Sequence, residues 1–306
     1  MRNIYLLLTI LFTTILLILF VFYNRYSNYY EDEKINAYIS KNIEILNENL
    51  SFEKRYALSL SLFVAKNENI KKALRENNQK LALSEIEKFL KDMKHSTGIS
   101  NIDIQIHTKD LRAFARNWDK SDYFGAKLGS FRKGLVRVKK SKKPFVSIEL
   151  GKRLNIKAIS PILDKEGNFI GSIEVIMDFQ NIQKRLRKFD LKMLPLLNER
   201  FIGIAVDLKN HKKIEGYYVV EKNYPKELYE KLKQNSYIFK DKKFFHIVDN
   251  KIIVLVPMLS VGIEDVGVIA LCMDAKYSEM DVSKRDIDFE NESYKFNKNY
   301  REVIIR

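Results

Sequence analysis

One uninterrupted hydrophobic run lies near the start of the chain. Residues 4–23, IYLLLTILFTTILLILFVFY, contain no charged side chain and are flanked by Arg2 and Arg25. A helix of about 20 apolar residues spans the hydrocarbon core of a bilayer. A secretory signal would have a shorter apolar region and a small-residue cleavage site, and neither is present. We therefore expect residues 1–24 to be a retained signal anchor rather than a cleaved signal peptide, with a cytoplasmic N-terminus and an exported body.

The next segment, residues 25–97, has a helical pattern. Apolar residues recur at spacings of three and four, without proline or glycine, which predicts a long helix continuing out of the membrane. Asparagines interrupt the pattern around residues 67–69 and at residues 77–78, so we expect breaks there. A further helix, LALSEIEKFLKDMK, is predicted to end near Gly98.

After Gly98 the hydrophobic period changes from three or four to two, which is typical of strands. Strands are predicted over 102–108 and 112–118, and a short helix over 134–143. Three further strands are predicted over 145–151, 154–163 and 169–179, with Gly167 in the turn between the last two. A helix over 180–189 closes this block.

A second block repeats the order of the first. Strands are predicted over 201–207 and 213–220, a helix over 225–235, and strands over 242–248, 251–259 and 266–274, with a tight turn at Asp249–Asn250. Helices set against antiparallel sheets indicate an α+β fold. We expect two modules in tandem, residues 98–190 and 191–275, followed by a charged C-terminal tail, 276–306.

Composition narrows the function. The chain is basic, with a net charge of +15, but it has no nucleic-acid-binding signature, so we expect no nucleic acid partner. The four histidines are scattered, and no nucleophile, phosphate-loop or dinucleotide motif is present. We therefore expect no enzyme activity, no metal and no cofactor. The single cysteine, Cys272, lies in an apolar run and is expected to be a buried, unreactive thiol.

The stretch RAFARNWD, residues 112–119, suggests a binding surface. Side chains alternate along a strand, so Arg112, Phe114, Arg116 and Trp118 are expected on one face. Cations beside aromatic rings make a poor hydrophobic core but a good wall for an anion pocket. The alternative interpretation is a solvated strand face with scattered aromatic side chains.

The order of a membrane span, a long helix and two α+β modules resembles the double Cache sensor domains of bacterial chemoreceptors and sensor kinases. The resemblance is carried by RAFARNWD, by YFGAKLGSFRKGLVRVKKSKKP and by SIELGKRLNIKAISPILDKEGNFIGSIEV, and it is greatest for the third double-Cache subfamily. It covers residues 103–179 well, whereas the second module matches in architecture alone. The resemblance implies two PAS-like antiparallel-sheet modules, the first of which binds a small molecule between its sheet and the covering loops.

The resemblance also implies site residues. Arg116 and Trp118 match the R-x-W spacing that amino-acid-binding relatives use for a ligand carboxylate, and a guanidinium fork and an indole N–H suit that role chemically. The other candidates are in the covering loop and the following hairpin: Tyr123, Phe131, Arg132, Glu149 and Arg153. Where relatives place aspartates for a ligand ammonium, this chain has Ser147 and Glu149, and Glu174 and Asp178 follow. The ligand is therefore expected to be a carboxylate or an amino acid, while an ion pair between Glu149 and Arg153 is the structural alternative.

Receptors with this sensor normally continue into a second span and an output module, and this sequence contains neither. We expect a single-pass protein of the inner membrane with a periplasmic body, working as a homodimer or as a heterodimer with an output transducer. A truncated or split receptor is one explanation. A membrane-anchored interaction protein without a small-molecule ligand is the other.

Overall fold

The structure, a computed structural model, describes residues 2–98, 101–118, 123–130, 132–241, 243–260 and 263–275. The charged tail predicted over 276–306 lies outside the described residues, and so does the candidate site residue Phe131. The chain forms helices and two antiparallel sheets, so the predicted α+β class is confirmed.

A single helix, α1 (Arg2–Ala65), begins the fold. The breaks after it fall where the asparagines predict them: Asn67 caps α2 (Glu68–Arg75) by accepting from the Ile70 N–H, and Asn78 caps α3 (Gln79–Thr97) by accepting from the Leu81 N–H. Helix α3 ends at Gly98, whose φ of 71° lies in the left-handed region that glycine adopts without strain. A search of the described residues identifies no helix with the length and hydropathy of a membrane span.

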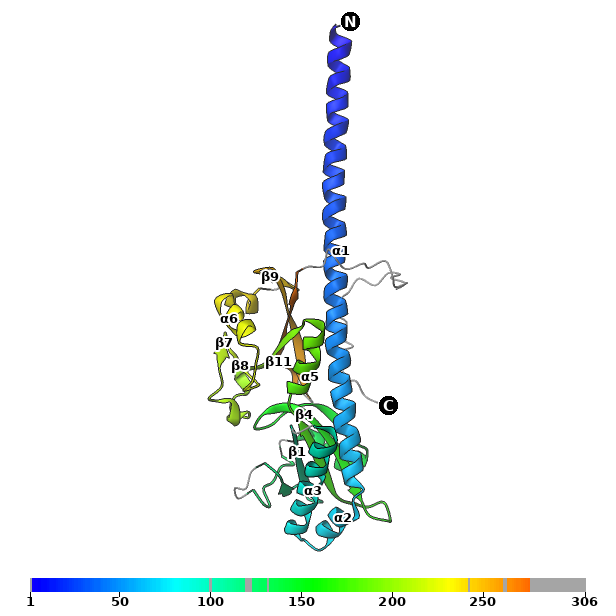
Figure 1. Cartoon of the computed structure of the whole chain (residues 1–306), viewed down its shortest axis with the longest axis vertical. Coiled ribbons are helices and arrows are strands. Elements are labelled where there is room, and N and C mark those ends of the chain that lie inside the picture. Colours follow the sequence, from blue (N-terminus) through cyan, green and yellow to red (C-terminus); the bar gives the residue numbers. More distant parts are fainter. Residues whose placement is uncertain are drawn as a thin grey trace.

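The first sheet lies beside the C-terminal end of α1, and we call it the distal sheet (Figure 1). Its strand order is β2-β1-β5-β4-β3, and every neighbouring pair is antiparallel. The predicted order of two strands, a helix and three strands is confirmed here. The elements are β1 (Ile102–Thr108), β2 (Ala113–Arg116), α4 (Lys133–Ser141), β3 (Phe145–Leu150), β4 (Leu154–Leu163) and β5 (Phe169–Met177).

Helix α5 (Gln180–Leu186) and the 3-10 turn η1 (Arg187–Phe189) lead to the second sheet, which lies nearer the N-terminal end of α1 (Figure 1). We call it the proximal sheet, and its order is β7-β8-β6-β11-β10-β9. Its elements are β6 (Lys192–Asn198), η2 (Glu199–Phe201), η3 (Val206–Leu208), β7 (Lys213–Ile214), β8 (Tyr217–Val219), α6 (Lys226–Gln234), η4 (Ser236–Phe239), β9 (His246–Val248), β10 (Lys251–Ser260) and β11 (Ile263–Asp274). Asp249 and Asn250 form the predicted tight turn, both with positive φ.

Several strand predictions are wrong. The single strand predicted over 213–220 is a hairpin of β7 and β8, because Glu215 and Gly216 have positive φ and form a turn between them. The strand predicted over 242–248 is reduced to the three residues of β9. Residues 201–207 form 3-10 turns with Ile204 and Val206 exposed, and the first strand of the proximal sheet is β6, immediately before them. The strand predicted over 112–118 is only four residues long, β2, and a bulge within it, opposite Ile106 and His107, breaks the alternation that would place Phe114 on the face of Arg116. Phe114 is buried in the main core rather than exposed in a pocket wall.

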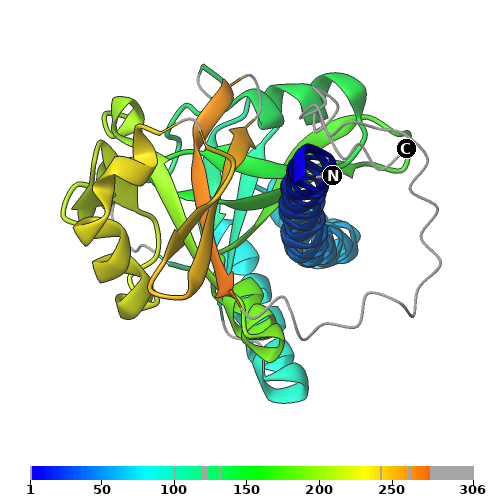
Figure 2. The same cartoon turned by 90° about the horizontal axis from the view of Figure 1, so that it is seen from above.

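Helix α1 packs against one face of the distal sheet, which we call the inner face. Apolar side chains of β1, β4 and β5 join those of α1 in one core, and Ser61 of α1 is hydrogen-bonded to Ser160 of β4 at 2.7 Å within it. Seen along its length, α1 runs beside the sheets rather than between them (Figure 2). The opposite, outer face of the distal sheet is therefore available to α4 and the loops. Cys272 is buried in a separate core under α6, as its apolar neighbours predict.

Strands β6 and β11 approach closely at Gly267. A Cβ atom at this position would lie 2.0 Å from the Leu196 carbonyl oxygen, so the two strands would have to separate. We expect Gly267→Ala to lower the free energy of unfolding by at least about 1–3 kcal/mol, the usual cost of overpacking a core. Gly203→Ala is the control, because a Cβ atom there would have nothing within 4 Å. Equal denaturation midpoints for the two variants would contradict the close approach.

Candidate functional site

The outer face of the distal sheet is polar where the inner face is apolar. Opposed residues of antiparallel strands share a face, so the register places Arg116 of β2, Gln105 of β1 and Glu174 of β5 in one row. The next row carries Lys157 of β4 and Ser147 of β3. Gln105, Glu174 and Lys157 are nevertheless buried, because α4 packs Leu135 and Val138 over Ile159 and Phe145 of the same face.

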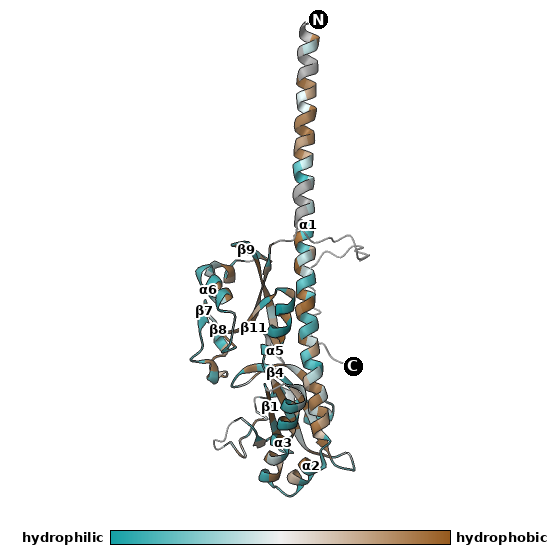
Figure 3. Ribbon diagram, viewed as in Figure 1, coloured by the Kyte–Doolittle hydropathy of each residue, from teal (hydrophilic) through white to brown (hydrophobic). Residues whose placement is uncertain are grey.

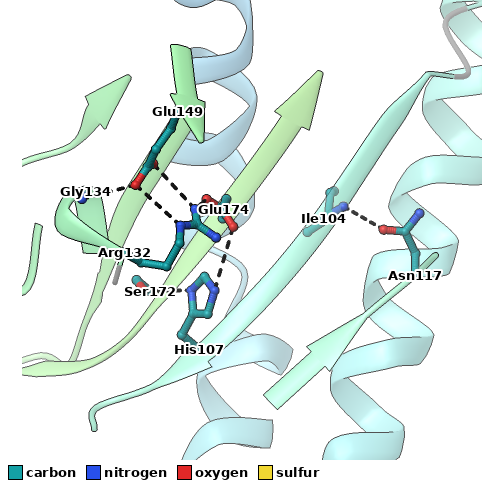
Figure 4. Close-up of polar contacts among 8 residues, drawn as sticks. All are labelled: Ile104, His107, Asn117, Arg132, Gly134, Glu149, Ser172 and Glu174. Carbon is teal, nitrogen blue, oxygen red and sulfur yellow. Dashed lines mark hydrogen bonds and ion pairs between the residues drawn. The ribbon is translucent and has the colours of Figure 1, made fainter. Parts of the chain in front are cut away.

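Arg132 forms the centre of a buried ion network on this face (Figure 4). Its Nε donates to Glu149 Oε1 at 3.4 Å, and its Nη2 donates to Glu174 Oε1 and to Glu149 Oε2. The Gly134 N–H adds a bond to Glu149 Oε1 at 3.3 Å. The two carboxylates raise the pKa of the guanidinium above its usual value despite burial, so Arg132 is permanently charged.

His107 lies on the other side of Glu174. Its Nδ1 is 3.1 Å from Ser172 Oγ, and its Nε2 is 3.9 Å from Glu174 Oε2 (Figure 4). Burial, and then the nearby Arg132 charge, lower the pKa of this imidazole to about 3. His107 is therefore neutral at physiological pH and offers a hydrogen bond rather than a charge.

Lys157 is the site residue that sequence reasoning missed. Burial lowers the pKa of its ammonium to about 8, and the Arg132 charge adds to that effect. A Cβ at Gly151 would lie 2.6 Å from the Lys157 Nζ, so this glycine leaves space for the ammonium. The available signal was the stretch LNIKAISPIL, in which a lone lysine interrupts a strand that is otherwise buried.

Arg116, Trp118 and Tyr123 form a second group at the β2 edge of the same face. The Arg116 guanidinium lies 4.0 Å from the Tyr123 ring centroid and 5.4 Å from that of Trp118. The Tyr123 hydroxyl accepts from the Arg116 N–H at 3.1 Å. Asn117, which lies between Arg116 and Trp118 in the sequence, is fixed to β1 because its side-chain oxygen accepts from the Ile104 backbone N–H at 2.6 Å (Figure 4).

The structure thus brings the candidate residues together in two groups. Arg132 and Glu149 belong to the ion network, and Arg116, Trp118 and Tyr123 belong to the aromatic group. One strand, β1, lies between β2, which carries Arg116, and β5, which carries Glu174, so the backbones of these two residues are about 10 Å apart. Arg153 belongs to neither group: it forms an ion pair with Asp103 at 2.7 Å, so the alternative pairing of Glu149 with Arg153 is wrong.

Three buried polar atoms of the outer face form no hydrogen bond to the part of the chain that the structure describes. They are His107 Nε2, Ser147 Oγ and Glu174 Oε2. Buried polar groups are almost always hydrogen-bonded, so these three atoms have hydrogen-bonding capacity that the described residues do not use. Among the described residues, no group of three or more histidine, cysteine or acidic side chains is arranged to hold a metal ion.

Comparison with known proteins gives one family. The model of dCache_3, described as "Double sensory domain of two-component sensor kinase", matches residues 33–262. No curated protein matches the chain.

The solved structures to which the chain is similar are distant in sequence. The sensor domain of the Vibrio cholerae histidine kinase DctB is 11% identical with a TM-score of 0.47, over 77% of this chain and 95% of that one. The ligand-binding domain of the Campylobacter jejuni chemoreceptor Tlp3 in complex with L-valine is 12% identical with a TM-score of 0.39, over 81% and 96%. The periplasmic domain of Vibrio cholerae LuxQ is 12% identical with a TM-score of 0.43, over 77% and 97%. At these values the neighbours do not indicate a ligand.

Proposed function

The chain belongs to the double Cache family of sensory domains, and on that premise we propose that it is a membrane-anchored, extracytoplasmic sensor of a small carboxylate or amino acid. The observation that carries this proposal is the outer face of the distal sheet. There the Arg116 guanidinium, stacked on Tyr123, lies on a strand separated by β1 from Glu174, whose Oε2, like His107 Nε2 and Ser147 Oγ, forms no hydrogen bond within the described residues. The candidate residues are Arg116, Trp118, Tyr123, Phe131, Arg132, Glu149 and Arg153. Of these, Arg116, Trp118 and Tyr123 are the proposed ligand contacts, and Arg132 and Glu149 support them.

Two roles follow for these groups. Arg116 would bind a ligand carboxylate, with Trp118 and Tyr123 excluding water from the contact. Glu174 Oε2 and Ser147 Oγ would bind the polar end of the ligand, which for an amino acid is the ammonium group. Arg132 is saturated by Glu149 and Glu174, so its part would be to hold those carboxylates in place rather than to bind an anion directly.

The proposed anchor is the apolar run 4–23. It forms the start of α1, and its described residues are mostly hydrophobic and exposed in the isolated chain (Figure 3). Residues 1–24 would cross the inner membrane and residues 25–97 would extend from it. The modules 98–190 and 191–275 would then be periplasmic, with the distal sheet farthest from the bilayer, and the tail 276–306 would follow.

A route for the signal runs through β5 and α5. Strand β5 carries Glu174 and leads into α5, where Arg185 donates to Asn49 at 2.9 Å and pairs with Glu53 at 2.5 Å, both on α1. Ligand binding that displaces β5 would thus move α5 against α1, a shift of the kind that sensors use. In a homodimer, or in a heterodimer with an output transducer, the partner would receive this movement.

Ligand screening tests the proposal. The full chain in lipid nanodiscs is heated with a panel of small carboxylates, amino acids and amines. We expect at least one carboxylate or amino acid to raise the midpoint of thermal unfolding, because a ligand that binds the folded state stabilises it. Arg116→Ala should reduce the shift at a fixed ligand concentration, because it weakens binding. A panel without any stabilising compound would favour the interaction protein over the sensor.

A further inference from the structure

The two modules meet at a pair of carboxyl groups, that of Glu221, which is buried, and that of Asp178, which is partly buried. Asp178 follows β5 directly, and Glu221 follows β8 in the other module. Glu221 Oε1 accepts from the Phe179 N–H at 3.0 Å, so a side chain of the proximal module holds the backbone that leaves the distal sheet. Phe179 is fully buried and Glu221 is 4% exposed. The junction therefore depends on a carboxyl group that is shielded from water.

Few cations face this pair. The Gln180 side chain is hydrogen-bonded to Glu221. The Gln180 backbone N–H donates to Asp178 Oδ1 at 3.0 Å. The charged groups around the pair are Asp103 of β1, Glu53 of α1 and Arg153 of the β3–β4 turn. Arg153 is already paired with Asp103, and Glu53 with Arg185. Asp178 and Glu221 thus share a site with little positive charge to compensate both.

Burial disfavours the ionised form of both groups, and for Glu221 the Asp178 charge adds to this effect. Burial first, and then the Asp178 charge, raise the pKa of Glu221 from 4.5 to about 7. Burial also raises the pKa of Asp178. A group whose pKa is higher in the folded than in the unfolded state stabilises the fold fully when the pH is below its unfolded-state pKa. This stabilisation is lost as the pH rises through the folded-state pKa. For Glu221 the relevant window lies between pH 4.5 and about 7.

We propose that Asp178 and Glu221 form a proton-binding switch between the two modules. When the pair holds a proton, the modules are joined firmly and movement of β5 passes to the proximal sheet. When both groups are ionised, their repulsion loosens the junction and uncouples the modules. The switch responds to the acidity of the surrounding medium and requires no ligand on the outer face of the distal sheet, so it adds a second input to the sensor.

The test follows the junction across pH in the full chain held in nanodiscs. Spin labels at Glu166→Cys in the distal module and Lys233→Cys in the proximal module report the distance between them; both positions are exposed, and the natural Cys272 is buried. We expect the distance distribution to narrow as the pH falls, with a midpoint near 7, the pKa of Glu221. The unfolding equilibrium constant of the wild type, divided by that of Glu221→Gln, should fall by about tenfold for each unit by which the pH is lowered between about 7 and 4.5.

Matched variants separate the switch from other titrations. Glu221→Gln, which keeps an oxygen acceptor for the Phe179 N–H, should show the narrow distribution at every pH, and Asp178→Asn should lower the midpoint. Glu227→Gln, an exposed glutamate of the same module paired with Lys192, should behave as the wild type. Arg116→Ala should also keep the wild-type response, which separates this switch from ligand binding. A response that persists in Glu221→Gln, or a wild-type distribution independent of pH, would overturn the proposal.

Discussion

Arg132→Met is expected to destabilise the distal module by about 3–5 kcal/mol, the usual cost of removing one partner from a buried ion pair. The variant leaves Glu149 and Glu174 charged, and these side chains are 5% and 0% exposed. Neither can reach water without opening the contact between α4 and the sheet. Since whole domains are stable by only about 5–15 kcal/mol, this loss would remove a large part of the total stability.

Denaturant unfolding, followed by the emission of the single tryptophan, Trp118, measures this loss within the same module. Arg153→Met is the matched control, because it removes an arginine from an ion pair whose partners are 40% and 26% exposed. We expect a loss of about 1 kcal/mol or less there, as for other solvent-accessible pairs. Equal losses for the two variants would show that the Arg132 network does not hold the module together.

Arg116→Ala is expected to weaken ligand binding by a factor of about 10–100, since a hydrogen bond to a charged group contributes about 1.5–3 kcal/mol. Arg116→Lys should recover little of this, because a single ammonium replaces the planar fork that stacks on Tyr123 at 4.0 Å. Calorimetric titration with the compound found by screening measures both variants.

The matched control for Arg116 is Arg200→Ala. Arg200 also lies over an aromatic ring, that of Phe201 at 4.7 Å, but in the proximal module and 54% exposed. Its loss should leave the affinity unchanged. Similar losses in both variants would indicate a general effect of surface charge rather than a contact at the distal sheet.

Much of the fold is predictable because local chemistry determines it. Asn67 and Asn78 interrupt a helical pattern and then cap the next helices, and Asp249–Asn250 forms a hairpin turn because both residues tolerate positive φ. The error at residues 201–207 has a different origin. A short apolar run has no period that distinguishes a strand from a turn. The strand that forms immediately before residues 201–207 is β6, and it contains Pro195, a residue that is uncommon in strands. Strand β6 tolerates this proline, whose carbonyl accepts from the Val220 N–H at 3.0 Å.

The candidate site was predictable only in part. The alternation of RAFARNWD pointed to Arg116 and Trp118, which do lie together. The pairing of Arg132 with Glu149 and Glu174 depends on how α4 lies across three strands, and no spacing along the chain reveals it. Lys157 was missed for the same reason, because its burial depends on the residues that cover the sheet.

The most direct measurement of the central claim is the emission of Trp118 in the full chain during titration with small carboxylates and amino acids. Trp118 is the only tryptophan and lies 5.4 Å from the Arg116 guanidinium, so selective excitation reports on this site alone. We predict a saturable change in emission for the compound that stabilises the protein, with its midpoint moved to a concentration about 10- to 100-fold higher in Arg116→Ala. A stabilising ligand that leaves the Trp118 emission unchanged, or that binds Arg116→Ala equally well, would place the binding site elsewhere and contradict the claim.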